Sequence, residues 1–274
     1  MTAKGPYAIL TDTTLCTGCE TCVKACKAAN KLGPDRPREG QGSAIDLSIS
    51  RYTTIVRKPG DRSVRRQCFH CIDPACVSAC IVGALQKTPE GPVYCDYSKC
   101  LGCRYCFVAC PFDVPRYEWE NAVPYMRKCT LCRERLVEGG IPACVEACPE
   151  KATIFGTREE MLAEAHRRLK AKPERYAQRV FGEKEVGGTS ILLISDIDLS
   201  FLAWTPDVPE KPMPEMTWAA LKKVPPTILA VGGLMAGVYW TIGRRMKMAE
   251  LRATESGAAP DNANPQKDEE KKNA

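Results

Sequence analysis

The cysteines constrain this chain more than any other feature, because sixteen of the seventeen fall into four tight groups of four. Only Cys95 lies outside the groups. Cysteines this close together suit metal chelation, whereas disulfide frameworks spread their cysteines between structural elements. In chain order the groups are Cys16, Cys19, Cys22 and Cys26; Cys68, Cys71, Cys76 and Cys80; Cys100, Cys103, Cys106 and Cys110; and Cys129, Cys132, Cys144 and Cys148.

The spacing within the groups points to a particular metal centre. The first and third groups have the pattern C-x2-C-x2-C-x3-C, and Pro111 follows the last cysteine of the third. This is the bacterial run of cysteines that holds 4Fe–4S clusters. Zinc is the main alternative, but four-cysteine zinc sites use two C-x2-C pairs separated by a loop. Sixteen thiols therefore predict four 4Fe–4S clusters, with four thiols each.

The composition suits a chain that is ordered by metal rather than by a large apolar core. Aromatic residues make up only 7% of the 274 residues, while 20 glycines and 21 prolines favour loops. Ligation by cysteine can offset the conformational entropy lost when such loops become ordered. The net charge of +6 is modest and the two signs are interspersed, so no nucleic-acid partner is expected. We expect the basic run Arg62–Arg66 to form a solvated face or a docking edge.

Short strands and helices are predicted around the cysteine groups. Residues 7–12 and 51–58 have the pattern of strands, and residues 23–31 that of a short helix. After the second group, a turn at 88–92 leads into a strand at 93–96. The succession of cysteine loop, short helix, bend and short strand is the half-unit of a ferredoxin-like fold, and four copies indicate two such domains. The expected fold class is α+β, with two ferredoxin-like dicluster domains of βαβ repeats and one C-terminal transmembrane helix.

The rest of the chain divides into an extension, a linker, an apolar segment and a tail. Thr157–Glu160 is a capping box that opens a helix with an apolar stripe, and residues 189–197 are typical of a strand. The expected regions are 1–157 for the four clusters, 158–203 for a helix–strand extension, 204–223 for a proline-rich linker, 224–243 for the transmembrane helix and 244–274 for a polar, disordered tail.

The apolar segment predicts a membrane anchor. Residues 224–243 form an uncharged run of twenty residues, and about 20 are needed to cross the hydrocarbon of a bilayer. A buried helix of a soluble domain is the alternative, but the flanking linker and tail offer nothing to bury it. More Lys and Arg follow the segment than precede it, which predicts a cytoplasmic C-terminus and a periplasmic cluster region. The first residues contain no apolar run and no twin arginine, so no secretory signal is expected on this chain.

Residues 7–157 resemble the iron–sulfur β subunits of the dimethyl-sulfoxide-reductase superfamily of respiratory complexes. The resemblance depends on the order of the four groups, on the C-x2-C-x4-C-x3-C spacing of the second, and on the runs Cys100–Cys106, Lys128–Arg133 and Pro142–Pro149. With the C-terminal span, the chain is similar to the membrane-anchored β subunits of the formate dehydrogenase N and hydrogenase-2 type. Proline is absent after the last cysteine of groups one and two, where Lys27 and Ile81 stand, but this residue only shapes the turn.

The resemblance implies which cysteines share a cluster. In the family, group one pairs with group four and group two with group three, and the last cysteine of a group crosses to the neighbouring cluster. Carried over, cluster 1 takes Cys16, Cys19, Cys22 and Cys148; cluster 2 takes Cys26, Cys129, Cys132 and Cys144; cluster 3 takes Cys68, Cys71, Cys76 and Cys110; and cluster 4 takes Cys80, Cys100, Cys103 and Cys106.

The resemblance also implies a function. The chain would relay electrons between a catalytic subunit, with molybdopterin, tungstopterin or nickel–iron chemistry, and a cytochrome b or quinone-binding subunit in the bilayer. The chain itself is not expected to be an enzyme, since it lacks dinucleotide-binding, P-loop, zinc-hydrolase and nucleophile-elbow motifs. The missing export signal favours a formate-dehydrogenase-like partner. The alternatives are a nickel–iron hydrogenase or another molybdopterin complex, and a polyferredoxin carrier without a fixed catalytic partner.

Three residues near the cysteine groups have simpler interpretations. Cys95 falls in a predicted strand, where a free cysteine behaves as a small buried hydrophobe. His70 lies between two cysteines of group two, and we expect it to pack the loop rather than tune a cluster. His166 is expected on an exposed helix face.

Overall fold

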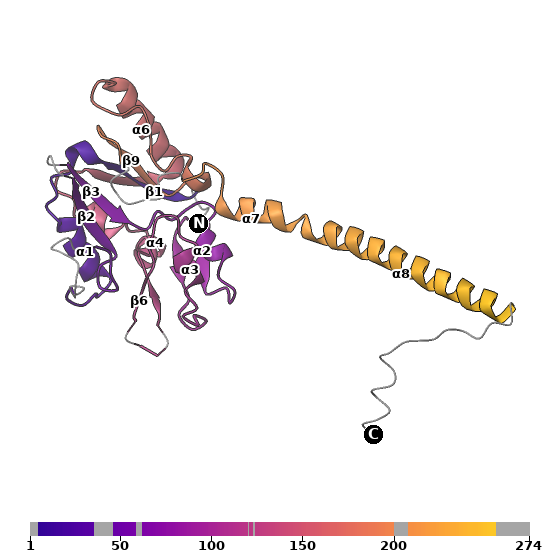
Figure 1. Ribbon diagram of the computed structural model, residues 1–274. Coiled ribbons are helices and arrows are strands. Elements are labelled where there is room, and N and C mark those ends of the chain that lie inside the picture. Colours follow the sequence, from indigo (N-terminus) through magenta and orange to yellow (C-terminus); the bar gives the residue numbers. More distant parts are fainter. Residues whose placement is uncertain are drawn as a thin grey trace. The chain divides into compact units, whose positions relative to one another are not determined.

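The computed structural model describes residues 5–35, 46–58, 62–119, 121–122, 124–199 and 208–255. The chain forms two compact units, Met1–Thr217 and Trp218–Ala274. Figure 1 shows the mixed helices and strands of the first unit and the long helix of the second. The first part of the expected linker, up to residue 207, and the tail from residue 256 lie outside the described residues.

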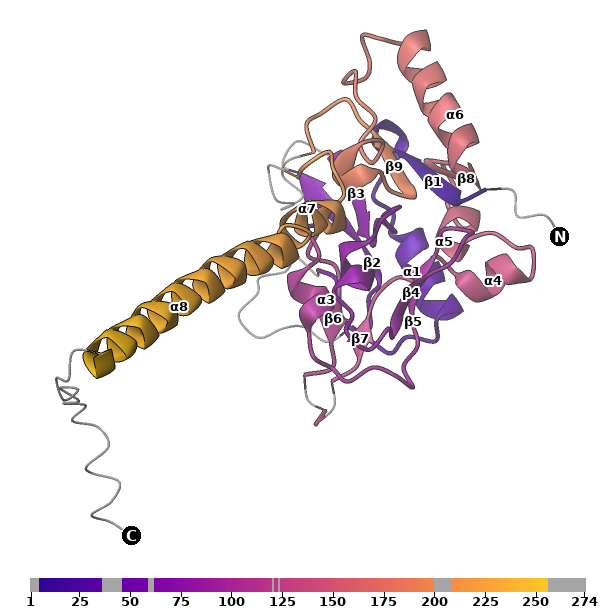
Figure 2. The same ribbon diagram turned by 90° about the vertical axis from the view of Figure 1, so that its right-hand side faces the viewer.

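A three-stranded sheet in the first unit joins segments that are far apart in the sequence. Its strands are β1 (Tyr7–Asp12), β8 (Thr153–Thr157) and β9 (Ile191–Ile194), in the order β8-β1-β9. β1 pairs with β8 antiparallel and with β9 in parallel, as the neighbouring ribbons in Figure 2 show. Strand β1 is central, and five of its six residues are buried, which agrees with its run of apolar side chains.

Helix α6 (Arg158–Ala171) begins at the predicted capping box and covers this sheet. The Thr157 side chain accepts a hydrogen bond from the Glu160 amide, and the Glu160 carboxylate accepts one from the Thr157 amide, which confirms the motif. Ala165 on α6 packs with Leu10 and Leu192 of the sheet in one apolar cluster. The helix–strand extension is thereby joined to the first strand of the chain, while the boundary at residue 157 stays a prediction.

Three hairpins and several short helices surround the cysteines. The hairpins are β2 (Thr53–Lys58) with β3 (Arg62–Gln67), β4 (Leu85–Lys87) with β5 (Val93–Cys95), and β6 (Arg116–Tyr117) with β7 (Met126–Arg127). The helices are α1 (Thr21–Ala29), α2 (Ala75–Ser78), α3 (Tyr105–Val108), α4 (Arg133–Val137) and α5 (Ala143–Glu146), with single 3-10 turns η1 (Thr13–Leu15) and η2 (Glu185–Gly187). Each cysteine group contains at least one of these helices or adjoins it, so the short helices fix the positions of the thiols.

The expectation for the basic run Arg62–Arg66 is wrong. The run lies on β3, where five of six residues are buried, and Arg65 and Arg66 are only 3% and 6% exposed. The neighbouring arginines of the strand meet carboxylates: Arg66 binds Asp46 at 2.8 Å, and Arg62 binds Asp196 at 2.5 Å. Most of the run is therefore buried, and carboxylates outside the strand pair with two of its three arginines.

The described part of the second unit is helical, and its long helix contains an uncharged run at residues 224–243. Helix α8 (Val224–Glu255) contains no buried residue, and with α7 (Met213–Leu221) it gives a stretch of 43 residues, Met213–Glu255, that is long and apolar enough to cross a membrane. The helix continues beyond residue 243, so residues 244–255, expected in a disordered tail, are helical. Residues 213–221, expected in the linker, are also helical. One C-terminal helix is therefore suited to membrane anchoring.

Candidate metal centres

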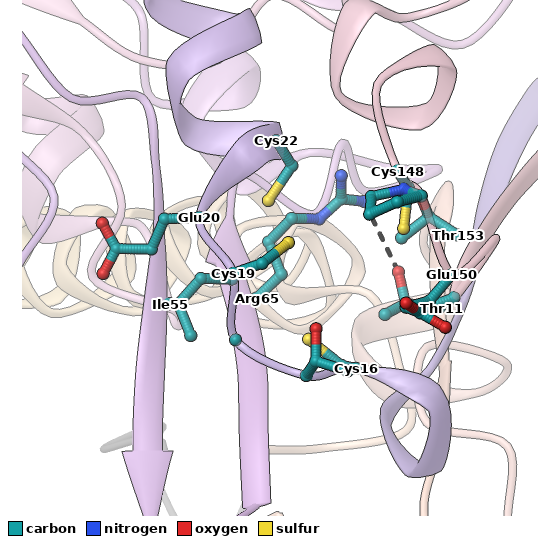
Figure 3. Close-up of a pocket in the computed structure, with 14 residues that line it drawn as sticks. Thr11, Cys16, Cys19, Glu20, Cys22, Ile55, Arg65, Cys148, Glu150 and Thr153 are labelled. Carbon is teal, nitrogen blue, oxygen red and sulfur yellow. Dashed lines mark hydrogen bonds between the residues drawn. The ribbon is translucent and has the colours of Figure 1, made fainter.

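One pocket at the start of the chain is lined by Cys16, Cys19, Cys22 and Cys148, and we call it site 1. The loop after η1 and the beginning of α1 supply the first three thiols, and the turn after α5 supplies the fourth. Figure 3 shows these four side chains around the pocket. Segments more than a hundred residues apart therefore form a single thiol site.

A second pocket, site 2, contains the remaining cysteines of groups one and four. It is lined by Cys26 from α1, Cys129 and Cys132 from the loop before α4, and Cys144 from α5. Sites 1 and 2 share helices α1 and α5, which contact each other. The last cysteine of group one and the last of group four thus lie in the neighbouring group's pocket.

Groups two and three exchange their last cysteines in the same way. A pocket that we call site 4 is lined by Cys80, Cys100, Cys103 and Cys106. Site 3 consists of Cys68, Cys71, Cys76 and Cys110. Burial raises the pKa of Cys71 and Cys76, and charge repulsion from Cys68 and Cys110 nearby raises both further. The structure therefore gathers the four sets that the family resemblance implies, and ligation by these sets stays a prediction.

The four cysteine loops share one backbone feature. The second residue between the first two cysteines of each group has a positive φ: 72° at Gly18, 47° at His70, 69° at Gly102 and 55° at Leu131. A left-handed residue there turns the chain sharply, and it is disfavoured for side chains other than glycine. At Gly102 a Cβ atom would also lie 2.8 Å from the Pro124 carbonyl oxygen. A left-handed turn repeated at the same place in all four groups indicates four loops built to wrap the same kind of group.

Hydrogen bonds reach several of the thiol sulfurs. The Leu131 amide donates to Cys129 Sγ at 3.3 Å, and the Leu85 amide donates to Cys80 Sγ at 3.4 Å. The Tyr117 hydroxyl lies 2.8 Å from Cys106 Sγ in a buried contact. Donors to sulfur stabilise thiolates and raise the reduction potential of iron–sulfur clusters.

Burial governs the electrostatics of these sites. Desolvation raises the pKa of the Cys22 thiol to about 11 and that of Cys26 to about 12, with a further increase from neighbouring thiols. Without metal these thiols are protonated at neutral pH, so metal binding releases protons. Two buried cations lie near thiols of the sites. Burial lowers the pKa of Arg65 and of Lys128, but nearby thiols raise both above their usual values: Cys144, Cys22 and Cys129 act on Arg65, and Cys68, Cys76 and Cys129 act on Lys128.

The donor sets fit iron–sulfur clusters better than single ions. Among the described residues, no three His, Cys, Asp or Glu side chains converge on one point as a mononuclear metal ion requires. Four thiols spaced around an open pocket suit a larger, polynuclear group. All-thiolate donor sets with amide donors to sulfur are the environment in which 4Fe–4S clusters are held.

Thiols of different sites interact electrostatically in a connected series. Cys22 of site 1 interacts with Cys144 of site 2, and Cys129 of site 2 with Cys68 of site 3. Cys76 of site 3 interacts in turn with Cys106 of site 4. Each site therefore has an interacting thiol in the next site of the series.

Several residues at the sites differ from their sequence-based interpretation or were missed. Cys95 lies in the predicted strand, but it also lines the pocket of site 4 beside Cys100. His70 is buried, and its Nδ1 accepts a hydrogen bond from the Val93 amide at 2.9 Å, as expected for loop packing. Arg65 and Tyr117 were not singled out. Residues 62–67 contain one apolar side chain, Val64, and no alternating pattern, so no local signal could have indicated that Arg65 is buried.

The fold and the thiol sites define an iron–sulfur protein with a 4Fe–4S dicluster domain. The family described as "4Fe-4S dicluster domain" matches residues 62–158. These residues include groups two, three and four, and the pairing of groups places group one against group four.

The chain belongs to the family of iron–sulfur subunits that includes the hydrogenase-2 operon protein HybA and the formate dehydrogenase iron–sulfur subunits. It is 39% identical to HybA of Escherichia coli O157:H7 over 234 residues, 70% of this chain and 71% of HybA. It is 35% identical to the iron–sulfur subunit of nitrate-inducible formate dehydrogenase of Escherichia coli K12 over 216 residues, 70% of this chain and 68% of that subunit. A protein of Nitratidesulfovibrio vulgaris is 38% identical over 265 residues, 92% of this chain and 71% of that protein.

Proposed function

We propose that this chain is the electron-transfer subunit of a membrane-bound respiratory oxidoreductase, with four 4Fe–4S clusters held in two ferredoxin-like units. The observation that carries the proposal is the connected series of four thiol sites, each with four cysteines of the four groups. A 4Fe–4S cluster supplies one-electron redox chemistry when bound. The residues of the chain hold the clusters, and electron relay requires no catalytic group from the chain.

The residues of the chain have three tasks in this function. The cysteines hold the four clusters with the pairing given above, so that groups one and four form one unit and groups two and three the other. Three groups donate hydrogen bonds to ligand sulfurs: the amides of Leu85 and Leu131 and the hydroxyl of Tyr117. These bonds adjust the reduction potentials of the clusters. The buried cation Arg65 offsets the negative charge of the thiolates in sites 1 and 2, and Lys128 offsets that in sites 2 and 3.

The names of the relatives support two kinds of catalytic partner. One is the iron–sulfur subunit of a formate dehydrogenase, and another belongs to a hydrogenase-2 operon. We propose a catalytic subunit of the formate dehydrogenase kind, with a nickel–iron hydrogenase or another molybdopterin enzyme as the alternative. Electrons would pass between this subunit and a cytochrome b or quinone-binding subunit in the membrane.

The second unit supports the membrane part of the proposal. Helix α8 contains no buried residue and an uncharged run at residues 224–243, and Arg244, Arg245, Lys247 and Arg252 follow that run. The positive-inside rule then places the C-terminus in the cytoplasm and the cluster unit on the periplasmic side. A soluble polyferredoxin carrier, the second candidate, would have no use for such a helix.

Metal analysis and spectroscopy test the proposal. The purified full-length chain should contain about sixteen irons, at four per cluster, and show four reducible clusters by EPR. Co-purification from membranes should bring a catalytic subunit whose molybdenum, tungsten or nickel content identifies its class. Fewer than four clusters, or oxidation of formate or hydrogen by the purified chain alone, would contradict the proposal.

A further inference from the structure

Arg65 is a buried cation without a carboxylate partner. Its side chain is 3% exposed, and its Nε and Nη1 atoms have no hydrogen-bond partner among the described residues. Nη2 reaches Thr11 Oγ1 at 3.4 Å, a weak contact between a charged donor and a neutral hydroxyl. Burial of a charged guanidinium costs desolvation free energy, and negative charge nearby is needed to offset it.

The other arginines of the same strand make the contrast clear. Arg62 and Arg66, also on β3, each form an ion pair with an aspartate, at 2.5 Å and 2.8 Å. Arg65 points to the other side of the strand from Arg66 because side chains alternate along a β-strand. The strand thus presents one arginine to the thiol sites and its neighbour to carboxylates.

The negative charge near Arg65 comes from two sites at once. Arg65 lines the pocket of site 1, where Figure 3 shows its side chain among Cys16, Cys22 and Cys148. On the site 2 side, the thiols of Cys144 and Cys129 interact electrostatically with Arg65. The guanidinium, with its unpaired donors, therefore lies between sites 1 and 2.

We propose that Arg65 is a positioning residue for electron transfer, whose fixed charge and free N–H donors raise the reduction potentials of the clusters in sites 1 and 2 together. A cluster with four thiolates is negatively charged, and reduction adds one further negative charge. A cation between two such clusters stabilises the electron on either of them and weakens the repulsion between them. This inference rests on the proposed function.

Arg65→Gln tests the inference because it removes the charge while it keeps a polar side chain of similar reach. We expect the potentials of the clusters in sites 1 and 2 to fall, and those in sites 3 and 4 to stay unchanged. At a fixed poised potential the ratio of reduced to oxidised cluster should fall about tenfold, which corresponds to about 59 mV for a one-electron couple. The readout is a redox titration of the full-length chain followed by EPR.

Companion variants assign the signals and control for general effects. Cys19→Ala and Cys103→Ala identify the signals of sites 1 and 4. Arg62→Gln removes a cation from the same strand, but its side chain is 43% exposed and solvent screens it, so the potentials should not move. Arg65→Lys keeps the charge and should retain most of the wild-type potentials even where Arg65→Gln loses a cluster.

The possible outcomes separate this inference from the proposed function. Wild-type protein with fewer than four clusters contradicts the proposed function itself. If four clusters are present and Arg65→Gln leaves all potentials unchanged, or shifts all four equally, the role of Arg65 is refuted. A fall in the potentials of sites 1 and 2 in Arg65→Lys as large as in Arg65→Gln would refute it too, because the charge is retained in the lysine variant.

Discussion

At the scale of single residues, Cys103 is a predicted cluster ligand and Cys95 is not. Both thiols line the pocket of site 4, but Cys95 lies on β5 outside the four groups, and Cys103 belongs to the C-x2-C-x2-C run. We predict that Cys103→Ala removes one cluster, or converts it to a form with fewer irons, and that Cys95→Ala retains all four. Iron quantitation should give about sixteen irons for Cys95→Ala, at four per cluster, and fewer for Cys103→Ala. Loss of a cluster from Cys95→Ala would make Cys95 a ligand.

Tyr117 provides a second test at this scale. Its hydroxyl lies 2.8 Å from Cys106 Sγ, and its side chain is buried beside site 4. Tyr117→Phe removes a donor to a ligand sulfur, so the potential of the cluster in site 4 should fall while the iron content stays at the wild-type level. Tyr105→Phe is the matched control, because that side chain is 56% exposed and should leave the potential unchanged. Equal potentials in wild type and Tyr117→Phe would exclude a tuning role for this hydroxyl.

The residue types at the sites could be predicted from the sequence, but their neighbours could not. The spacing of the cysteines indicates clusters without reference to the fold, since three thiols of one run must face one centre. The burial of Arg65 depends on β1 and on group four, which lie far away in the sequence. The sequence of a basic run shows its net charge. It does not show which arginine pairs with a carboxylate and which lies near thiols.

At the scale of elements, the left-handed turn in each cysteine loop is a testable part of the fold. Gly102 and Gly83 both have a positive φ, at 69° and 62°, but only Gly102 has an atom in the way of a Cβ, the Pro124 carbonyl oxygen. Gly83→Ala should cost about 1 kcal/mol of stability from backbone strain alone. Gly102→Ala should cost more and should lower the occupancy of site 4. Thermal unfolding monitored by cluster absorbance compares the two, and equal midpoints would contradict the close approach at Gly102.

The bounds of helices and strands were predicted best where nearby residues mark the start or end of the element. Strand β1 begins and ends as expected, and α6 begins at its capping box. The strand expected at 189–197 is shorter, at Ile191–Ile194. The two-residue strands β6 and β7 were not predicted, because two residues are too few to show an alternating pattern.

At the scale of the whole molecule, the pairing of distant segments is what the sequence alone could not give. Strand β1 joins β8 and β9, which both lie more than a hundred residues further along the chain, and this pairing brings the turn after α5 to site 1. The cysteine run itself predicts that its last cysteine crosses to a neighbouring cluster, and only the family resemblance indicated which groups are neighbours. Spacing within a group gives no information on which groups are neighbours.

The C-terminal helix leads to a prediction for the whole chain. If α8 spans a bilayer, two arginines near the middle of its apolar run should raise the free energy of membrane insertion by about 5 to 7 kcal/mol for the pair. The test is Val231→Arg combined with Leu234→Arg, both exposed in the structure. Carbonate washing of membranes should release the variant, while the wild-type chain stays in the pellet.

Matched arginines near the end of the same helix distinguish membrane insertion from a general effect of charge. Met248→Arg combined with Leu251→Arg adds the same charge beside Lys247 and Arg252, outside the uncharged run, so this variant should stay in the membrane. Both variants should keep the wild-type iron content, because the thiol sites belong to the other compact unit. If the central pair of arginines leaves the chain in the pellet, a membrane-bound partner holds the cluster unit there and α8 is not the anchor.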